Sequence, residues 1–340
     1  MDRIELHTNS IWSKELALSD PAQIVSMCAK YGCKAVAITD RNSVQGYMDA
    51  EQEAVQKGVT LIYGLTVDCV DADDRYAVTL LAKNEQGREQ IFDLIKQLHR
   101  KEPALGLYVT RAELDAHREG LLFGASAVDG QLVRAIQLQK SERTLQAAAQ
   151  TYDYIELPLE PYDVSAKLCQ LAHNCGIPLC AVQCSSLYNG RDEVFRHIYQ
   201  ALALHEGICA NATMYLSGEE LEQEFRELYI LPSQKEAIEE ALHHGPEQIF
   251  SQIQPMPTLE QWVHEGSEEM HRDAMEKLET SAWRKFAERY GDNPEPRRKK
   301  RLEFELQKID EAQVAADMMV LEEMAAALSA ENSPISFGGN

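Results

Sequence analysis

Three side chains in the sequence are of types that bind zinc, but they are spread along the chain. They are His7, Asp40 and Cys184, and imidazole, carboxylate and thiolate groups are the usual zinc ligands in proteins. Because the three share no motif spacing, separate structural roles are the simpler interpretation: a capped strand end, a turn-forming Asp and a buried thiol. Only a fold that brings them together would make a metal site of them.

Familiar catalytic and nucleotide-binding motifs are absent. The sequence contains no GxGxxG, GxxxxGK(S/T), GxSxG or HExxH pattern, which excludes the common phosphate-cradling loops and the α/β-hydrolase elbow. One basic cluster, residues 297–301 (RRKKR), could contact phosphate. Leu302, Leu306 and Ile309 follow it at helical spacing, so we interpret the cluster as the solvated face of a helix.

Charge and composition are those of an acidic globular protein. The 340 residues are 44% hydrophobic and 26% charged, which is ordinary for a folded chain. Lys and Arg number 33 against 55 Asp and Glu, a net charge of −22, and such a surface repels phosphate backbones. We therefore expect no direct DNA binding, and solubility is the simplest role of the charge.

Neither a signal peptide nor a membrane-spanning segment is expected from the sequence. The opening residues MDRIE are acidic, and no apolar run approaches the roughly 20 residues of a membrane helix. None of the eight Cys forms a CxxC pair, and without a secretion signal we interpret them as reduced thiols. We expect a cytoplasmic protein without membrane contact.

Short apolar strands alternate with helical patterns over the first 190 residues, which predicts an α/β fold. Seven strands are expected, at residues 4–7, 35–39, 59–63, 77–82, 121–124, 154–157 and 178–182. Between them, Asp20 with Pro21 and Thr110 with Glu113 mark helix starts. The alternation predicts a parallel sheet, either open or closed into a barrel.

A parallel α/β fold gathers its ligands at the carboxyl ends of its strands. The side chains expected there are His7 with Asn9, Asp40 with Arg41, Thr66, Ala127, and Cys184 with Ser186. These positions are therefore the candidate site.

The strand signal disappears after about residue 190, and the remaining sequence is predicted to be helical. A capping box at Ser217 and Glu220 marks one helix start in this part. We expect an α/β domain over residues 1–205, a helical region over 206–332 and a frayed tail over 333–340.

The order of several segments resembles the PHP domain of bacterial DNA polymerase III alpha subunits, and the PolC type in particular. The resemblance begins with IELHTNSIWS, GCKAVAITDRNSVQGY, VTLIYGLTVDC and YAVTLLAKNEQG. It continues through EGLLFGASAVDGQL, YDYIEL and GIPLCAVQCSSLYN to RLEFELQKI, or about residues 3–339. It implies a TIM-like, distorted (β/α)₇ barrel, followed by the helical segment that links the PHP domain to the polymerase palm.

The resemblance also implies a metal centre that this sequence has largely lost. Active members of the family hold up to three Zn, Mn or Fe ions with nine ligands, and His7 matches the first of them. The other eight positions carry Asn9, Leu16, Arg41, Thr66, Ala77, Ala127, Cys184 and Ser186. Asp40, beside one of these positions, is kept. The comparison implies that His7 is a vestigial ligand, that no catalytic residue or cofactor remains, and that Arg41 places a guanidinium near the former metal position.

These losses predict a pseudoenzyme. We expect a non-catalytic PHP-like domain with a scaffold or interaction role linked to DNA replication. A protein is the expected partner, and the replication proteins are the candidates. Residues 71–76 leave no room for the exonuclease that interrupts PolC, and residues 336–339 align with the start of the palm, so no DNA synthesis is expected.

Two alternatives stay open at the level of sequence. One is a residual metal-dependent phosphoesterase that uses His7, Asp40 and Cys184. The other is a truncated polymerase III alpha fragment without a role of its own. The intact capping boxes and strand patterns favour a chain that still folds.

Overall fold

The computed structural model describes residues 3–13, 17–72, 74–100, 106–159, 161–183, 215–228, 232–291 and 294–330. The chain divides into two compact units, Met1–Met256 and Pro257–Asn340, which are described separately. The expected domain boundary at residue 205 and the expected tail over 333–340 lie outside the described residues. The same holds for three candidate site positions, Leu16, Cys184 and Ser186.

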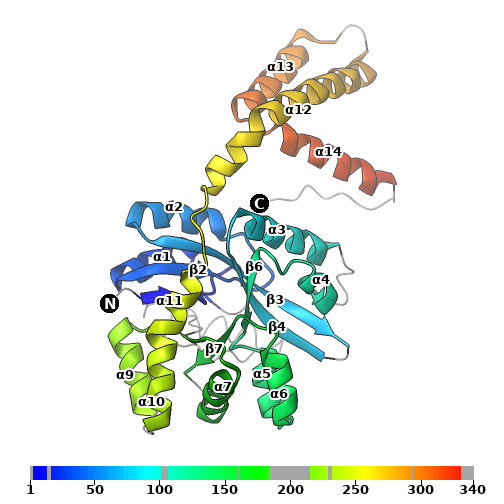
Figure 1. The fold of residues 1–340 in the computed structure, drawn as a ribbon. Coiled ribbons are helices and arrows are strands. Elements are labelled where there is room, and N and C mark those ends of the chain that lie inside the picture. The colour runs from blue at the N-terminus through cyan, green and yellow to red at the C-terminus, as the bar shows by residue number, and fades with distance from the viewer. Residues whose placement is uncertain are drawn as a thin grey trace. The chain divides into compact units, whose positions relative to one another are not determined.

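An eight-stranded sheet forms the centre of the first unit and curves into a nearly closed barrel (Figure 1). Seven strands follow one another in the order β1-β2-β3-β4-β6-β7-β8, while β5 pairs with β3 at the side. The strands are β1 (Arg3–Glu5), β2 (Cys33–Ile38), β3 (Thr60–Asp71), β4 (Asp74–Ala82), β5 (Val109–Thr110), β6 (Leu121–Ala125), β7 (Tyr154–Pro158) and β8 (Leu179–Val182). The predicted α/β class and barrel-like sheet are confirmed.

One strand departs from the predicted parallel arrangement. β4 is antiparallel to both β3 and β6, whereas β1, β2 and β3 and then β6, β7 and β8 pair in parallel. The reason is that β3 is twelve residues long and turns back directly into β4, with Ala72 at a φ of 52° in the turn. No crossover helix separates the two strands, so β4 must reverse its direction.

Helices follow most strands and cover the barrel from outside (Figure 1). They are α1 (Pro21–Lys30), α2 (Tyr47–Lys57), α3 (Glu85–His99), α4 (Arg111–Asp115), α5 (Gln131–Gln137), α6 (Glu142–Ala149) and α7 (Tyr162–Cys175). Asp20 caps α1 by accepting a hydrogen bond from the backbone N–H of Gln23, and Thr110 and Glu113 form the predicted capping box of α4. These local signals therefore fix where the helices begin.

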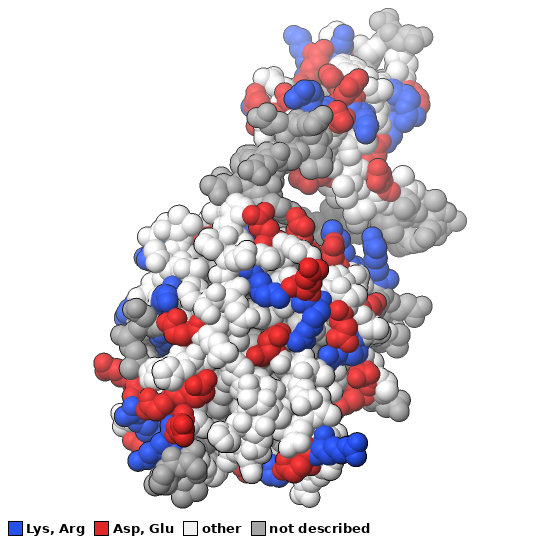
Figure 2. All heavy atoms as spheres, in the orientation of Figure 1, with Lys and Arg blue, Asp and Glu red and all other residues white. Residues whose placement is uncertain are grey.

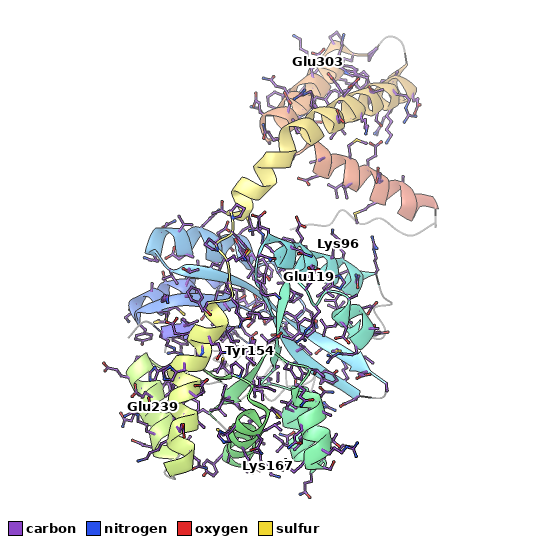
Figure 3. All side chains as sticks on the ribbon, viewed as in Figure 1. Lys96, Glu119, Tyr154, Lys167, Glu239 and Glu303 are labelled. Carbon is purple, nitrogen blue, oxygen red and sulfur yellow. The ribbon has the colours of Figure 1, made fainter. Side chains whose placement is uncertain are left out.

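A further helical segment packs onto the barrel. It consists of α9 (Gly218–Leu228), α10 (Pro232–Glu239), the π-helix η3 (Glu240–His244) and α11 (Gly245–Phe250). Ile249 of α11 joins a buried cluster with Ile4, Leu6 and Tyr154, and the ring of Tyr154 on β7 is fully buried (Figure 3). Apolar burial of this kind ties the segment to the barrel core.

The second unit is helical throughout its described residues. It comprises α12 (Leu259–Tyr290), α13 (Pro296–Glu311) and α14 (Ala315–Ala330). Its interior is small, with Ala274, Leu306 and Ala315 among the buried side chains. Among the described helices of the whole chain, none combines the length and apolar character needed to cross a membrane.

Candidate functional site

His7 lies at the carboxyl end of β1 with its imidazole inside the barrel, where 2% of it is exposed. Nδ1 donates to the carboxylate of Glu156 and lies 3.0 Å from each of its oxygens. Nδ2 of Asn9 lies 3.2 Å from Nε2 and donates to it when the imidazole is neutral. Both ring nitrogens therefore have a protein partner, and neither presents a free lone pair to a metal ion.

Glu156 is the site residue that sequence reasoning missed. It stands in β7, is completely buried, and also accepts a hydrogen bond of 2.8 Å from the backbone N–H of Ala127. The signal was present in the sequence, because an acidic side chain inside the apolar strand YIELP needs a buried partner. Its partner is 149 positions away, so the sequence pattern alone could not name it.

Asp40, at the end of β2, organises the loop that follows β1. Its Oδ1 accepts from the backbone N–H of Ser10 at 2.5 Å and from Oγ of Ser13 at 2.8 Å. Its Oδ2 accepts from Oγ of Ser10 at 2.7 Å. Burial raises the pKa of the Asp40 carboxyl even though these hydrogen bonds lower it. The carboxylate oxygens are thus occupied by the loop.

Arg41 turns its guanidinium toward two carboxylates. Nε and Nη2 lie 3.0 and 2.6 Å from Oδ1 of Asp68, and Nη1 lies 2.9 Å from Oδ2 of Asp129. Oδ2 of Asp68 also accepts from Nη2 of Arg75 at 3.0 Å and from Nδ2 of Asn42 at 3.3 Å. A positive charge of the protein itself therefore neutralises the carboxylates on this side of the barrel.

The remaining described ligand positions offer little to a metal. Thr66 is buried, and its Oγ1 has no hydrogen-bond partner among the described residues. Ala77 and Ala127 contribute methyl groups, although the backbone N–H of Ala127 binds Glu156. Within the part of the chain that the structure describes, no group of three or more His, Cys, Asp or Glu side chains could hold a metal ion.

The donor set therefore does not fit the metal cluster that the sequence resemblance implies. A multi-metal centre needs several carboxylates and imidazoles that converge with free lone pairs. Here, of the six expected ligand positions within the described residues, only His7 carries a ligand side chain, and its imidazole is bound between Glu156 and Asn9. The arrangement is a buried polar network that holds the ends of β1, β6 and β7 together.

The protonation of His7 should make stability depend on pH. Burial by itself lowers the pKa of the imidazole, but the charge and hydrogen bond of Glu156, with the charges of Glu5 and Asp40, raise it above 6.5. The folded state then binds the proton more tightly than the unfolded state. The resulting stabilisation is complete below pH 6.5, the unfolded value, and is lost as the pH rises through the folded pKa.

Urea denaturation of the wild-type chain and of His7→Gln, between about pH 5.5 and pH 8.5, measures this effect. We expect the wild-type advantage in free energy of unfolding to be largest at the acidic end and to shrink toward the basic end. A difference that stays the same at every pH would show that His7 does not titrate in the folded protein.

Residues 5–158 match the model of the PHP domain family. This part of the chain is therefore a PHP domain, and His7 and Glu156 lie within it. The match runs from the last residue of β1 to the end of β7, and every described residue of the candidate site lies within it.

The curated relatives are PolC-type polymerases, as the sequence resemblance predicted. The chain is 42% identical over 69 residues to the DNA polymerase III PolC-type of Oceanobacillus iheyensis, which covers 20% of this chain and 5% of that protein. It is 24% identical over 255 residues to the DNA polymerase III PolC-type of Clostridium perfringens, which covers 68% of this chain and 17% of that protein. The chain thus spans only a small part of the length of these relatives.

Solved structures with a similar fold include two bacterial proteins. One comes from Bifidobacterium adolescentis and is inferred to be a metal-dependent phosphoesterase. It is 15% identical to this chain with a TM-score of 0.40, and the match covers 54% of this chain and 88% of that one. The other, an amidohydrolase from Chromobacterium violaceum, is 13% identical with a TM-score of 0.37, and the match covers 53% and 86% of the two chains.

Proposed function

We propose that this PHP domain is a pseudoenzyme, and that the chain acts as a scaffold or interaction module linked to DNA replication. The proposal depends on one observation: both ring nitrogens of His7 already have hydrogen-bond partners, Glu156 and Asn9. The relation to PolC-type polymerase III supports the replication context.

The electrostatics of the barrel support the loss of hydrolysis. Clustered carboxylates repel one another unless a cation offsets their charge. In this chain the offsetting charge comes from Arg41, which binds Asp68 and Asp129. A phosphoesterase needs clamped metal ions to make hydroxide and to hold a phosphate, and an arginine that is already paired supplies neither function.

Metal content tests the pseudoenzyme proposal directly. We expect elemental mass spectrometry of the purified, dialysed chain to find Zn, Mn and Fe far below one ion per chain. His7→Gln is the matched control, because it removes the one retained ligand type at the site. Two or three ions per wild-type chain that disappear in His7→Gln would establish a residual phosphoesterase centre and overturn the proposal.

Restoring two ligand positions should not restore hydrolysis. In the double variant Asn9→His with Arg41→His, the positions of Thr66, Ala77 and Ala127 still lack ligand atoms. We expect its hydrolysis of p-nitrophenyl phosphate with added Mn²⁺ to equal that of the control Asn9→Gln with Arg41→Gln. Metal-dependent turnover in the histidine variant alone would contradict this account of the site.

Gel filtration of mixtures tests the scaffold role. The purified chain is expected to elute together with at least one purified subunit of the replicative polymerase assembly of the same cell. If every subunit elutes separately over a wide concentration range, the chain has no partner among them, and the replication link fails.

A further inference from the structure

The second unit contains a hollow between α12 and α13 that is lined by positive side chains. Its volume is about 1020 Å³. The cations that line it are Lys285, Arg289, Arg297, Arg298, Lys300 and Arg301. The first two come from the last turns of α12 and the other four from the first turns of α13, so two helices contribute to one surface.

This concentration of positive charge is exceptional in an acidic chain. Residues 284–301 hold eight Lys and Arg against three Asp and Glu, whereas the chain as a whole has a net charge of −22. Figure 2 shows Lys and Arg side chains over the helices of this unit, with Asp and Glu among them. The helix predicted for residues 297–301 is confirmed, with Leu306 buried, but the cluster also includes Lys285 and Arg289, which the pattern of a single helix cannot reveal.

Several of these cations have no acidic partner. Among the described residues, three of the six lining cations, Arg289, Arg297 and Lys300, make no ion pair. Lys285 pairs with Glu322 at 2.5 Å, and Arg298 pairs with Glu295 at 3.6 Å. The pair between Arg301 and Glu305, at 2.7 Å, is exposed on both sides. Exposed pairs contribute little stability, so the three unpaired cations are the ones that the hollow offers most directly to a ligand.

Aromatic rings line the same hollow. Phe286, Tyr290 and Phe304 contribute to its surface, and Phe304 is 49% exposed. The guanidinium carbon of Arg298 lies 4.6 Å from the centre of the Tyr290 ring. Rings beside cations are the combination that binds unpaired bases together with their phosphates. An acidic peptide would use the charges but would gain no stacking contact from the exposed ring of Phe304.

The net charge of the whole chain led us to expect no direct DNA binding, but this local surface differs from the rest. We propose that the hollow binds a single-stranded polynucleotide, with its phosphates on the cations and its bases against the exposed ring of Phe304. Two acidic side chains, Glu295 and Glu305, also line the hollow, so binding should be modest and strongly dependent on salt. The proposal rests on residues of the second unit and does not depend on the loss of catalysis in the PHP domain.

Fluorescence anisotropy of the full chain with labelled oligomers of about 15 nucleotides, one of deoxythymidine and one of uridine, tests the proposal. We expect micromolar affinity at low salt, weakened by about tenfold when NaCl is raised from about 50 mM to about 200 mM. A stronger signal with one oligomer would identify the sugar that the site prefers. No saturable binding of either oligomer at low salt would overturn the proposal.

Two double variants test whether binding depends on the cations of the hollow or only on the net charge of the chain. Arg297→Glu with Lys300→Glu should weaken binding by about tenfold or more, because two phosphate contacts become repulsive. The control Lys140→Glu with Lys167→Glu makes the same change in net charge on exposed residues of the barrel unit, where Figure 3 labels Lys167 on α7. It should leave the affinity unchanged, and an equal loss in the control would show that only net charge matters.

The aromatic contribution distinguishes a polynucleotide from an acidic protein. Phe304→Leu keeps every charge and should weaken oligonucleotide binding by about fivefold or more. Poly-glutamate of the same length should compete poorly with the oligonucleotide. Equal competition, together with full binding by Phe304→Leu, would assign the hollow to an acidic protein partner and reject the polynucleotide. Circular dichroism of each variant confirms that its helices are intact.

Discussion

Replacement of Glu156 by Leu is expected to lower the free energy of unfolding by about 3–5 kcal/mol. The substitution leaves His7 inside the barrel without the carboxylate that binds its Nδ1. It also removes the acceptor for the backbone N–H of Ala127. A buried polar group that loses its partner carries the full cost of its desolvation, which is larger than the net gain from an ordinary hydrogen bond.

Urea denaturation followed by circular dichroism measures this change, with two controls. Glu119→Leu makes the same chemical change at an exposed position (Figure 3) and should alter stability by no more than about 0.5 kcal/mol. The double variant His7→Leu with Glu156→Leu removes both partners, so its cost should be clearly smaller than the sum of the two single changes. If Glu156→Leu costs no more than Glu119→Leu, the buried pair does not stabilise the barrel.

The result bears on how the barrel keeps polar and charged side chains inside it. The retained imidazole of His7 must still be desolvated inside the barrel, and Glu156 and Asn9 supply the partners that make this possible. Arg41 likewise forms ion pairs with the carboxylates of Asp68 and Asp129. Within this barrel, buried charges are thus compensated by other protein side chains.

Local sequence patterns were sufficient to place most elements of the barrel. Alternating apolar strands and capped helices predicted the α/β class, and the hydrogen bond to Asp20 at the start of α1 shows why such caps can be recognised. The direction of β4 could not be predicted in this way. It depends on the reversal at Ala72 and on pairing with β3 and β6, and neither leaves a signal in the apolar pattern of the strand itself.

The sequence predicted which strand ends carry the candidate site residues, but it did not predict which side chains bind them. His7, Asp40 and Arg41 were expected where parallel strands end, and the described structure places them there. The groups that bind them could not be named, because Glu156 lies 149 positions from His7 and Asp129 lies 88 positions from Arg41. Contacts over such separations arise from the closure of the barrel, which local periodicity does not encode.

Replacement of Gly245 by Ala is expected to destabilise the barrel unit by about 2–3 kcal/mol. Gly245 begins α11 with ordinary helical dihedral angles, φ −61° and ψ −52°, so alanine introduces no backbone strain. A Cβ at this position would instead lie 1.9 Å from the carbonyl oxygen of Leu179 in β8. Because that neighbour is backbone, α11 must move away from the sheet, and Ile249 moves with it out of the buried cluster.

Gly218→Ala is the matched control, because Gly218 also begins a helix. The nearest atom to a Cβ there is Cδ of Arg3 at 3.9 Å, an ordinary contact, and alanine should be neutral or should stabilise α9 by up to about 1 kcal/mol. Urea denaturation of the two variants compares the effects. Equal stabilities would mean that α11 does not pack tightly on β8. A large loss in Gly245→Ala alone would show that the segment after β8 is part of the barrel's stability, so any partner surface on α9 to α11 depends on the barrel beneath it.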